Sequence, residues 1–223
     1  MADFRTHLGV AAAGAAVVAH GGWQVGLWSA AESLPVLALV TFGGILPDID
    51  ADSSKAIRLI FNLLAVPAVV AGALLLQGHL ATGSLLLACG ALYLGVRYLA
   101  GALFARFTVH RGLWHSLLAA ALCGLGGAAL SHRLFAQPAH LAWAHGVALA
   151  LGFVIHLLLD ELFSVDLTGA RLKRSFGTAL KPFDWRSPGN SLVMLLAAAN
   201  LLPWLPPWGP LLGLVAQGAA LWR

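Results

Sequence analysis

The chain consists mainly of long apolar runs separated by short polar segments. Apolar runs of about 20 residues are typical of helices that cross a membrane, and shorter runs broken by Gly or Pro are typical of interrupted or re-entrant helices. The pattern therefore predicts an all-α fold, a polytopic integral membrane helix bundle of about seven to eight transmembrane or re-entrant helices. The expected helices cover about 8–29, 34–47, 58–77, 83–105, 113–130, 141–162, 190–203 and 208–222.

Composition strengthens this interpretation. Hydrophobic residues make up 60% of the 223 residues and charged residues only 10%, with a mean hydropathy of +0.85. Soluble domains carry about 25% charged residues, so a soluble fold of this composition would lack the polar side chains to cover its surface. No long polar linker divides the apolar runs, and we expect a single transmembrane domain over 1–223. The first run is expected to be a retained helix and not a removed signal peptide.

Positive charge is confined to alternate segments between the apolar runs. Short loops rich in Lys and Arg stay on the cytoplasmic side, which places these segments on the cytoplasmic face of the cell inner membrane. The segment 163–189 mixes basic with aromatic residues, which predicts an interfacial segment in contact with membrane lipid. No nucleic-acid partner is expected, because the loops account for the net charge of +4. The basic segments are 48–58, 106–111, 163–189 and both chain ends. A single basic residue, Arg133, occurs in the alternate segments 30–34, 78–82 and 131–140.

Two carboxylates, Asp48 and Asp50, directly follow the second apolar run. Gly43-Gly44 and Pro47 predict that this helix is short and ends in irregular backbone, which membrane proteins tolerate where it is buried or lines a cavity. Ionised side chains near membrane depth are costly and usually pair, bind a metal or serve chemistry. We expect both aspartates to reach a metal site, or one of them to act as a general base.

Histidines and one further aspartate occur at the same predicted membrane face. His156 and Asp160 are four residues apart, so both project from one face of a helix. His110 and His115 lie around a predicted helix start, and Arg111 between them is suited to an anion such as phosphate.

The first predicted helix begins near a further candidate ligand, His7. Mixed imidazole and carboxylate ligation favours a divalent transition metal, with Zn²⁺ or Mn²⁺ expected first, and this set of side chains is large enough for one or two ions. The remaining histidines are expected to pack or to lie at the interface on the outer side.

Three classes of function fit such a site. The first is a metal-dependent hydrolase that cleaves an ester or phosphoester bond of a lipid or lipid-linked substrate, since two metal ions can clamp the attacking and leaving oxygens. A metal-ion or proton-coupled transporter would need polar residues continuing to the opposite face and inverted repeats, whereas the outer halves of the expected helices are almost wholly apolar. A structural protein stapled by a metal would need a closed site.

Three motifs occur in the order LPDID, HRGLWHS and HLLLD. In a polytopic protein this set resembles the LexA-regulated membrane-bound metal-dependent hydrolases, the YdjM-like inner-membrane proteins, from His7 to about Phe183. The resemblance implies hydrolase activity and a metal site. It also implies the metal residues His7, Asp48, Asp50, His110, His115, His156 and Asp160. The chain departs from the family pattern after HLLLD, where the longer stretch 161–183 replaces a short Thr/Gly segment that leads to a proline.

Overall fold

The computed structural model describes residues 3–50, 55–102, 112–166, 171–172 and 177–220. Its internal contacts divide the chain into two compact units. The first unit consists of Met1–Pro47 together with Leu113–Arg223, and the second consists of Asp48–Gly112. Within the described residues nearly all regular structure is helical, and several helices are strongly apolar. The predicted all-α membrane helix bundle is therefore confirmed.

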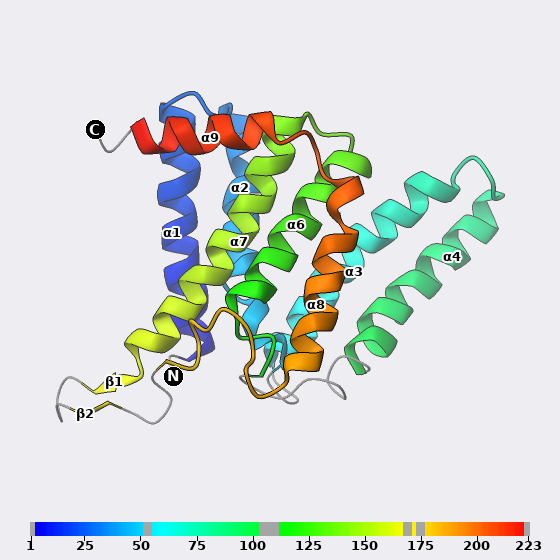
Figure 1. Cartoon of the computed structure of the whole chain (residues 1–223). Helices are drawn as coiled ribbons and strands as arrows, with labels where there is room; N and C mark the ends of the chain where they lie inside the picture. The colour runs from blue at the N-terminus through cyan, green and yellow to red at the C-terminus, as the bar shows by residue number, and fades with distance from the viewer. Residues whose placement is uncertain (1–2, 51–54, 103–111, 167–170, 173–176, 221–223) are drawn as a thin grey trace. The chain divides into compact units, whose positions relative to one another are not determined.

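In the first unit, α7 is the central helix and packs against α1, α2, α6 and α9 (Figure 1). The helix α8 packs against α6. Two short antiparallel strands after α7 pair Val165 with Leu172 and Asp166 with Arg171, a feature that the sequence analysis did not predict. The elements of this unit are α1 (Phe4–Gln24), α2 (Ala30–Gly43), α6 (Leu117–Arg133), α7 (Ala139–Leu162), β1 (Val165–Asp166), β2 (Arg171–Leu172), α8 (Pro188–Asn200), the 3-10 helix η3 (Leu202–Trp204) and α9 (Gly209–Ala220).

The second unit is a helical hairpin of α3 (Lys55–Leu76) and α4 (Thr82–Leu94), with α4 continuing into a π-helical turn, η2 (Gly95–Ala100). A Cβ added at Gly72 would lie 2.2 Å from Leu92 Cδ1, so the glycine lets the two helices approach. The Tyr93 hydroxyl donates to Asn62 Oδ1 at 3.3 Å. The 3-10 helix η1 (Leu46–Asp50) follows α2 and leads into this unit.

The turn between α1 and α2 is set by local capping chemistry. Ser29 and Glu32 form a capping box, with the Ser29 N–H donating to Glu32 Oε2 at 2.7 Å and the Glu32 N–H donating to Ser29 Oγ at 3.3 Å. This cap starts α2 at Ala30. Gly26 in the turn has a φ of +75°, a conformation that glycine adopts without strain. The two helices were predicted over 8–29 and 34–47, so the first ends and the second begins earlier than expected.

The start of α1 is also capped by a side chain. The Asp3 carboxylate accepts the Thr6 N–H at 2.7 Å, which satisfies one of the free donors of the first turn. The same hydrogen bond holds the pKa of the Asp3 carboxyl below its usual value, because it favours the ionised form.

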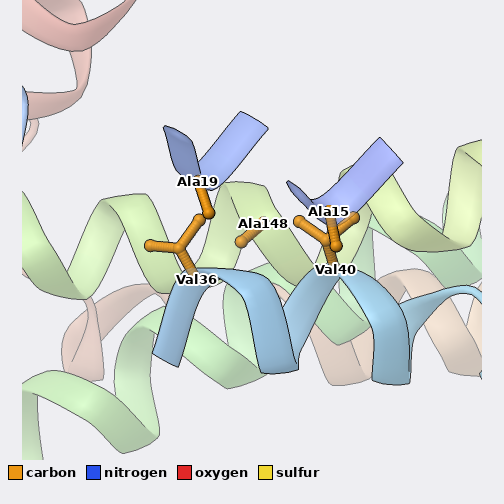
Figure 2. Close-up of a cluster of buried hydrophobic side chains, with 5 residues drawn as sticks. All are labelled: Ala15, Ala19, Val36, Val40 and Ala148. Atoms are coloured by element: carbon orange, nitrogen blue, oxygen red, sulfur yellow. The ribbon is translucent and has the colours of Figure 1, made fainter. Parts of the chain in front are cut away.

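Small residues let three helices of the first unit pack closely. Figure 2 shows Ala15 and Ala19 of α1 against Val36 and Val40 of α2 and Ala148 of α7. All five are buried, with exposed fractions of 2% or less. Packing through small side chains is the usual way for helices to associate in lipid.

In the described part of the chain, three helices are long and apolar enough to cross a membrane, namely Ile57–Leu76, Thr82–Ala100 and Ala139–Leu162. The pair Pro188–Trp204 and Gly209–Gly218 meets the criterion together but is bent by 106°, and Ala30–Gly43 and Leu117–Arg133 are apolar but shorter. Among the described residues the bundle therefore combines full-length spans with shorter and broken helices.

The sequence left open whether the last apolar region forms one helix or two, and the structure has two, α8 and α9. Side chains from the central helices hold the break between them. Arg133 donates to the carbonyl oxygens of Pro203 at 3.0 Å and Trp204 at 3.3 Å. The Trp143 indole N–H donates to the Pro207 carbonyl at 2.8 Å. These contacts satisfy carbonyls that a continuous helix would have used itself.

Candidate metal centre

Four ionisable side chains converge at one end of the first unit. His7 lies in the first turn of α1, His115 lies two residues before α6, and His156 and Asp160 are one turn apart in α7. All four are buried, with exposed fractions of 2% or less. Segments that are far apart in the sequence thus contribute to one buried polar cluster. This cluster is a candidate site for a metal ion and is called the metal centre below.

Asp160 contacts two of the histidines through its two carboxylate oxygens. Its Oδ1 lies 3.4 Å from His7 Nε2, and its Oδ2 lies 3.8 Å from His115 Nε2. Two ligand atoms of a tetrahedral ion with bonds of about 2.0–2.1 Å are separated by about 3.3–3.4 Å. The spacing of His7 and Asp160 therefore fits two ligands of one metal ion. His115 approaches the other oxygen of the same carboxylate, so Asp160 lies between two of the histidines.

The imidazole rings are packed against one another. The rings of His7 and His156 are stacked, with centroids 3.6 Å apart and 10° between their planes, and the ring of His115 meets His156 edge-on at 5.8 Å. One donor atom from each of His7, His156 and Asp160 lies within 4.8 Å of the other two. The three side chains form a compact group that could hold a metal ion.

A backbone carbonyl orients His156. Its Nδ1 lies 2.8 Å from the Gly44 carbonyl oxygen, and a carbonyl only accepts, so Nδ1 carries the proton. In the neutral ring Nε2 then carries the lone pair that a metal uses. Metal-binding histidines almost always donate their second nitrogen in this way, which fixes both the tautomer and the ring orientation.

Glycines at the end of α2 make this contact possible. A Cβ added at Gly43 would lie 2.2 Å from the Leu149 carbonyl oxygen, and one at Gly44 would lie 2.2 Å from Ala11 Cβ. Any side chain at either position would push α2 away from α7 or α1. The Gly43-Gly44 pair therefore serves close helix packing, which brings the Gly44 carbonyl to His156.

His115 is held in place by the residues around it. The Trp114 indole N–H donates to the Leu46 carbonyl at 2.9 Å, and its ring meets Phe153 of α7 edge-on at 6.2 Å. Ser116 caps α6 by accepting the Ala119 N–H at 3.2 Å. His115 thus lies between an anchored tryptophan and a helix cap.

The chemistry of the donor set fits a transition metal. A carboxylate that is fully buried is strongly destabilised unless other groups compensate its charge. Three imidazoles and one carboxylate are ligands typical of Zn²⁺, Mn²⁺ or Fe²⁺, whereas Mg²⁺ and Ca²⁺ prefer oxygen donors. His7 Nδ1 is a buried ring nitrogen with no hydrogen-bond partner among the described residues. The centre therefore has the composition and the polar donors that a metal ion would use.

The structure brings together four of the predicted site residues, His7, His115, His156 and Asp160. Asp48 and Asp50 lie in η1, in the second unit, and their role as ligands or base stays a prediction. His110 and Arg111 lie outside the described residues, so their predicted roles likewise stay predictions.

Three other described histidines of the first unit, His20, His132 and His145, have local contacts at the opposite ends of these helices. His145 Nδ1 lies 2.7 Å from Ser131 Oγ, His132 Nδ1 lies 3.0 Å from the Gln137 carbonyl oxygen, and the ring of His20 meets Trp23 edge-on at 5.6 Å. These contacts fit the packing and interfacial roles that we expected for them.

Comparison with known protein families assigns the chain to one of them. A family model described as YdjM inner membrane protein matches residues 1–205. The chain belongs to the YdjM inner membrane protein family. The match includes all four residues of the metal centre and ends before α9. No curated protein and no solved structure matched the chain.

Membership confirms the resemblance inferred from the three motifs and identifies an inner membrane protein. One contact of the centre in this YdjM family member, between His156 and the Gly44 carbonyl, was missed from the sequence. The Gly44 carbonyl was missed because backbone acceptors have no sequence signature, and the Gly43-Gly44 pair predicted only a short helix that ends in irregular backbone.

Proposed function

We propose that this protein is a metal-dependent hydrolase that cleaves an ester or phosphoester bond of a membrane lipid or lipid-linked substrate. The observation that carries the proposal is the convergence of three buried histidines with the buried carboxylate of Asp160 at one end of the bundle. When bound, a divalent transition metal supplies Lewis acidity and lowers the pKa of a water molecule toward neutrality.

The protein side chains prepare the centre for such chemistry. His7, His156 and Asp160 are three ligands close enough for one ion, and catalytic zinc sites commonly use three protein ligands and keep a position open. The Gly44 carbonyl fixes the His156 tautomer, and Asp160 supplies the negative charge that balances a cation. His115 would serve as a ligand of a second ion or orient the carboxylate. Asp48 remains our candidate for a general base.

The packing next to the centre favours hydrolysis over transport. Along α1, the residues that follow His7 at intervals of four are Ala11, Ala15 and Ala19, and all three are buried. They pack against buried valines of α2 and an alanine of α7 (Figure 2). A transit path would need polar groups at this position, whereas a hydrolytic site needs access from one face alone.

A lipid substrate is supported by the membrane environment and by an exposed aromatic group near the start of α8. Trp185 is 70% exposed, its ring lies 4.0 Å from that of Phe183, and Arg186 is exposed beside it. Trp and Arg side chains are favoured at the level of lipid headgroups. We place this group and the metal centre at the cytoplasmic face, as the distribution of Lys and Arg predicts.

The proposal is tested by measuring the cleavage products that the protein releases from vesicles of defined lipid composition. Purified protein loaded with Zn²⁺ or Mn²⁺ is incubated with vesicles of phosphatidylethanolamine and phosphatidylglycerol, and the products are identified by mass spectrometry. Free fatty acid would indicate cleavage of a carboxylic ester, and a released headgroup or phosphate would indicate phosphoester cleavage. We expect turnover that a chelator and Asp160→Asn both abolish. A metal-loaded, folded protein whose products match those of chelator-treated protein would contradict the proposal for these lipids.

A further inference from the structure

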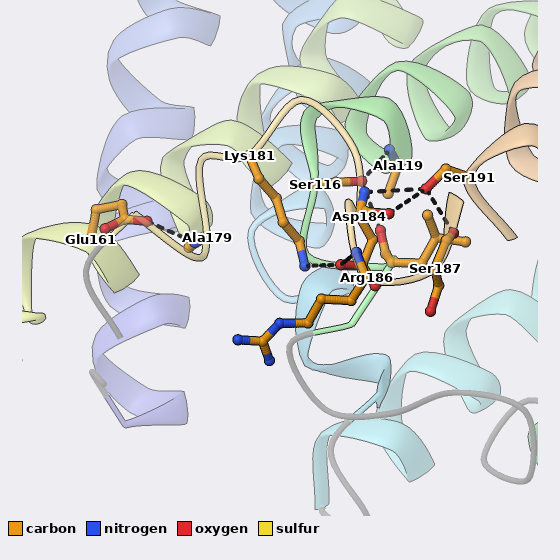
Figure 3. Close-up of polar contacts among 10 residues, drawn as sticks. Ser116, Ala119, Glu161, Ala179, Lys181, Asp184, Arg186, Ser187 and Ser191 are labelled. Carbon is orange, nitrogen blue, oxygen red and sulfur yellow. Dashed lines mark hydrogen bonds and ion pairs between the residues drawn. The ribbon is translucent and has the colours of Figure 1, made fainter. Parts of the chain in front are cut away.

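A second carboxylate at the end of α7 points away from the metal centre into a loop. Glu161 follows Asp160 directly and is buried, with an exposed fraction of 8%. Its Oε1 accepts the backbone N–H group of Ala179 at 2.7 Å (Figure 3). The same oxygen accepts the Leu180 N–H at 3.1 Å, and Oε2 accepts the Gly177 N–H at 2.8 Å. Hydrogen bonds to an ionised acceptor are roughly twice as strong as neutral ones, so Glu161 holds the start of this loop firmly.

The loop formed by residues 177–187, called the strap below, in turn holds the start of α6. The Lys181 carbonyl accepts the Leu117 N–H at 3.0 Å, and the Pro182 carbonyl accepts the Leu118 N–H at 3.0 Å. The first N–H groups of a helix have no partner within the helix. The strap supplies partners for two of them, and the second residue before Leu117 is His115.

The far end of the strap is also fixed. The Lys181 ammonium pairs with Asp184 Oδ1 at 3.2 Å. The Asp184 N–H donates to Ser191 Oγ at 3.2 Å, and the Ser191 hydroxyl contacts the Asp184 carbonyl at 3.1 Å (Figure 3). The strap is therefore anchored to α7 at one end and to the first turn of α8 at the other.

We propose that Glu161 is a positioning residue of the metal centre, which fixes His115 relative to Asp160 by holding the strap against the first turn of α6. This inference rests on the proposed metal centre. Neighbouring residues on a helix are about 100° apart around its axis. The last turn of α7 can thus direct Asp160 into the centre and Glu161 into the strap at the same time.

The connection matters because metal sites tolerate little displacement. Productive sites need their side chains within about 0.5 Å of the required position. His115 lies two residues before α6, so a displacement of the α6 start displaces its ring as well. Without the strap, the first turn of α6 is free to fray and His115 moves away from Asp160 Oδ2.

Glu161→Gln tests this role with little change in side-chain size. Glutamine offers one acceptor oxygen and turns an NH₂ group toward a backbone donor, so at least one of the three hydrogen bonds is replaced by donor–donor repulsion. Glu32→Gln is the matched control, since Glu32 lies in the α2 capping box and glutamine serves the same position there.

Two measurements on the full-length protein separate the outcomes. Co²⁺ titration followed by its visible absorption reports both affinity and ligand geometry at the centre, and hydrogen exchange of peptides covering 112–120 reports the α6 start. For Glu161→Gln we expect Co²⁺ affinity to fall about 10-fold, within the range typical for residues that orient metal ligands, with a changed spectrum and faster exchange. Glu32→Gln should match the wild type in Co²⁺ affinity, in the Co²⁺ spectrum and in hydrogen exchange. Unchanged affinity and spectrum in folded Glu161→Gln would overturn the positioning role.

A wild-type protein that binds no Co²⁺ would overturn the metal centre. Hydrogen exchange at 112–120 would then test only whether Glu161 and the strap hold the start of α6. If Glu161→Gln does not fold, Gly177→Ala replaces it. Gly177 has a φ of +78° and a Cβ there meets no atom within 4 Å, so alanine strains the strap without a clash. We expect faster exchange at 177–187 with a smaller loss of Co²⁺ affinity, and a loosened strap with unchanged affinity would overturn the inference.

Discussion

A close backbone contact between α7 and α2 gives a sharp test of how packing builds the metal centre. A Cβ added at Gly152 of α7 would lie 2.0 Å from the Val40 carbonyl oxygen and 2.9 Å from the Gly44 nitrogen. Both atoms belong to backbone, which cannot rotate away as a side chain does. Gly152→Ala must therefore separate α2 from α7.

The required separation follows from the contact distance. Ordinary contacts of a Cβ begin at 3.4 Å, so the carbonyl must retreat by about 1.4 Å. The hydrogen bond between His156 Nδ1 and the Gly44 oxygen is 2.8 Å long, and a retreat of this size at the neighbouring turn breaks it. Overpacking of this kind costs about 1–3 kcal/mol of stability, and loss of a group that orients a metal ligand costs about 10- to 100-fold in metal affinity.

Gly9→Ala is the matched control, because Gly9 is exposed on α1 and a Cβ there meets nothing within 4 Å. Thermal unfolding in detergent and Zn²⁺ titration compare the two variants. We expect Gly152→Ala to unfold at lower temperature and to bind Zn²⁺ more weakly, and Gly9→Ala to match the wild type in both. Equal unfolding temperature and Zn²⁺ affinity in the two variants would refute the role assigned to the contact between α2 and α7.

Three further substitutions distinguish residues that only stabilise the fold from a residue that also supports the metal centre. Ser29→Ala removes the α2 capping box and should lower stability by about 1 kcal/mol in thermal unfolding; an unchanged melting temperature would contradict this. Trp114→Phe and Trp143→Phe each remove one indole N–H donor from a carbonyl, that of Leu46 or of Pro207, at a cost of about 1–3 kcal/mol. Zn²⁺ affinity should fall only for Trp114→Phe, and an equal fall in both would show that general destabilisation is the cause.

The helical framework could be predicted because its signals are local. Apolar run length located the helices to within a few residues, since the hydrophobic effect and the membrane both select such runs. The boundaries of α1 and α2 were shifted because the Ser29–Glu32 capping box was not recognised. The strands β1 and β2 were missed because two-residue pairing leaves no periodic pattern.

The centre was predictable as a set of residue types but not as a geometry. His156 and Asp160 share a helix face, which spacing alone indicates. The approach of His7 and His115 depends on packing of α1, α2 and α7 through glycine and alanine, which no local pattern specifies. Glu161 and the Gly44 carbonyl could not be predicted, because their roles depend on which distant backbone groups they meet.

Metal content of the purified protein tests the central claim most directly. Protein in detergent is exposed to Zn²⁺ or Mn²⁺, desalted and measured by elemental mass spectrometry, for the wild type, His7→Ala, His156→Ala and the control His20→Ala. We expect about one or two equivalents of a divalent transition metal in the wild type and in His20→Ala. The metal should be lost in His7→Ala and His156→Ala. A folded wild-type protein without metal, or equal metal in all four proteins, would contradict the metal centre.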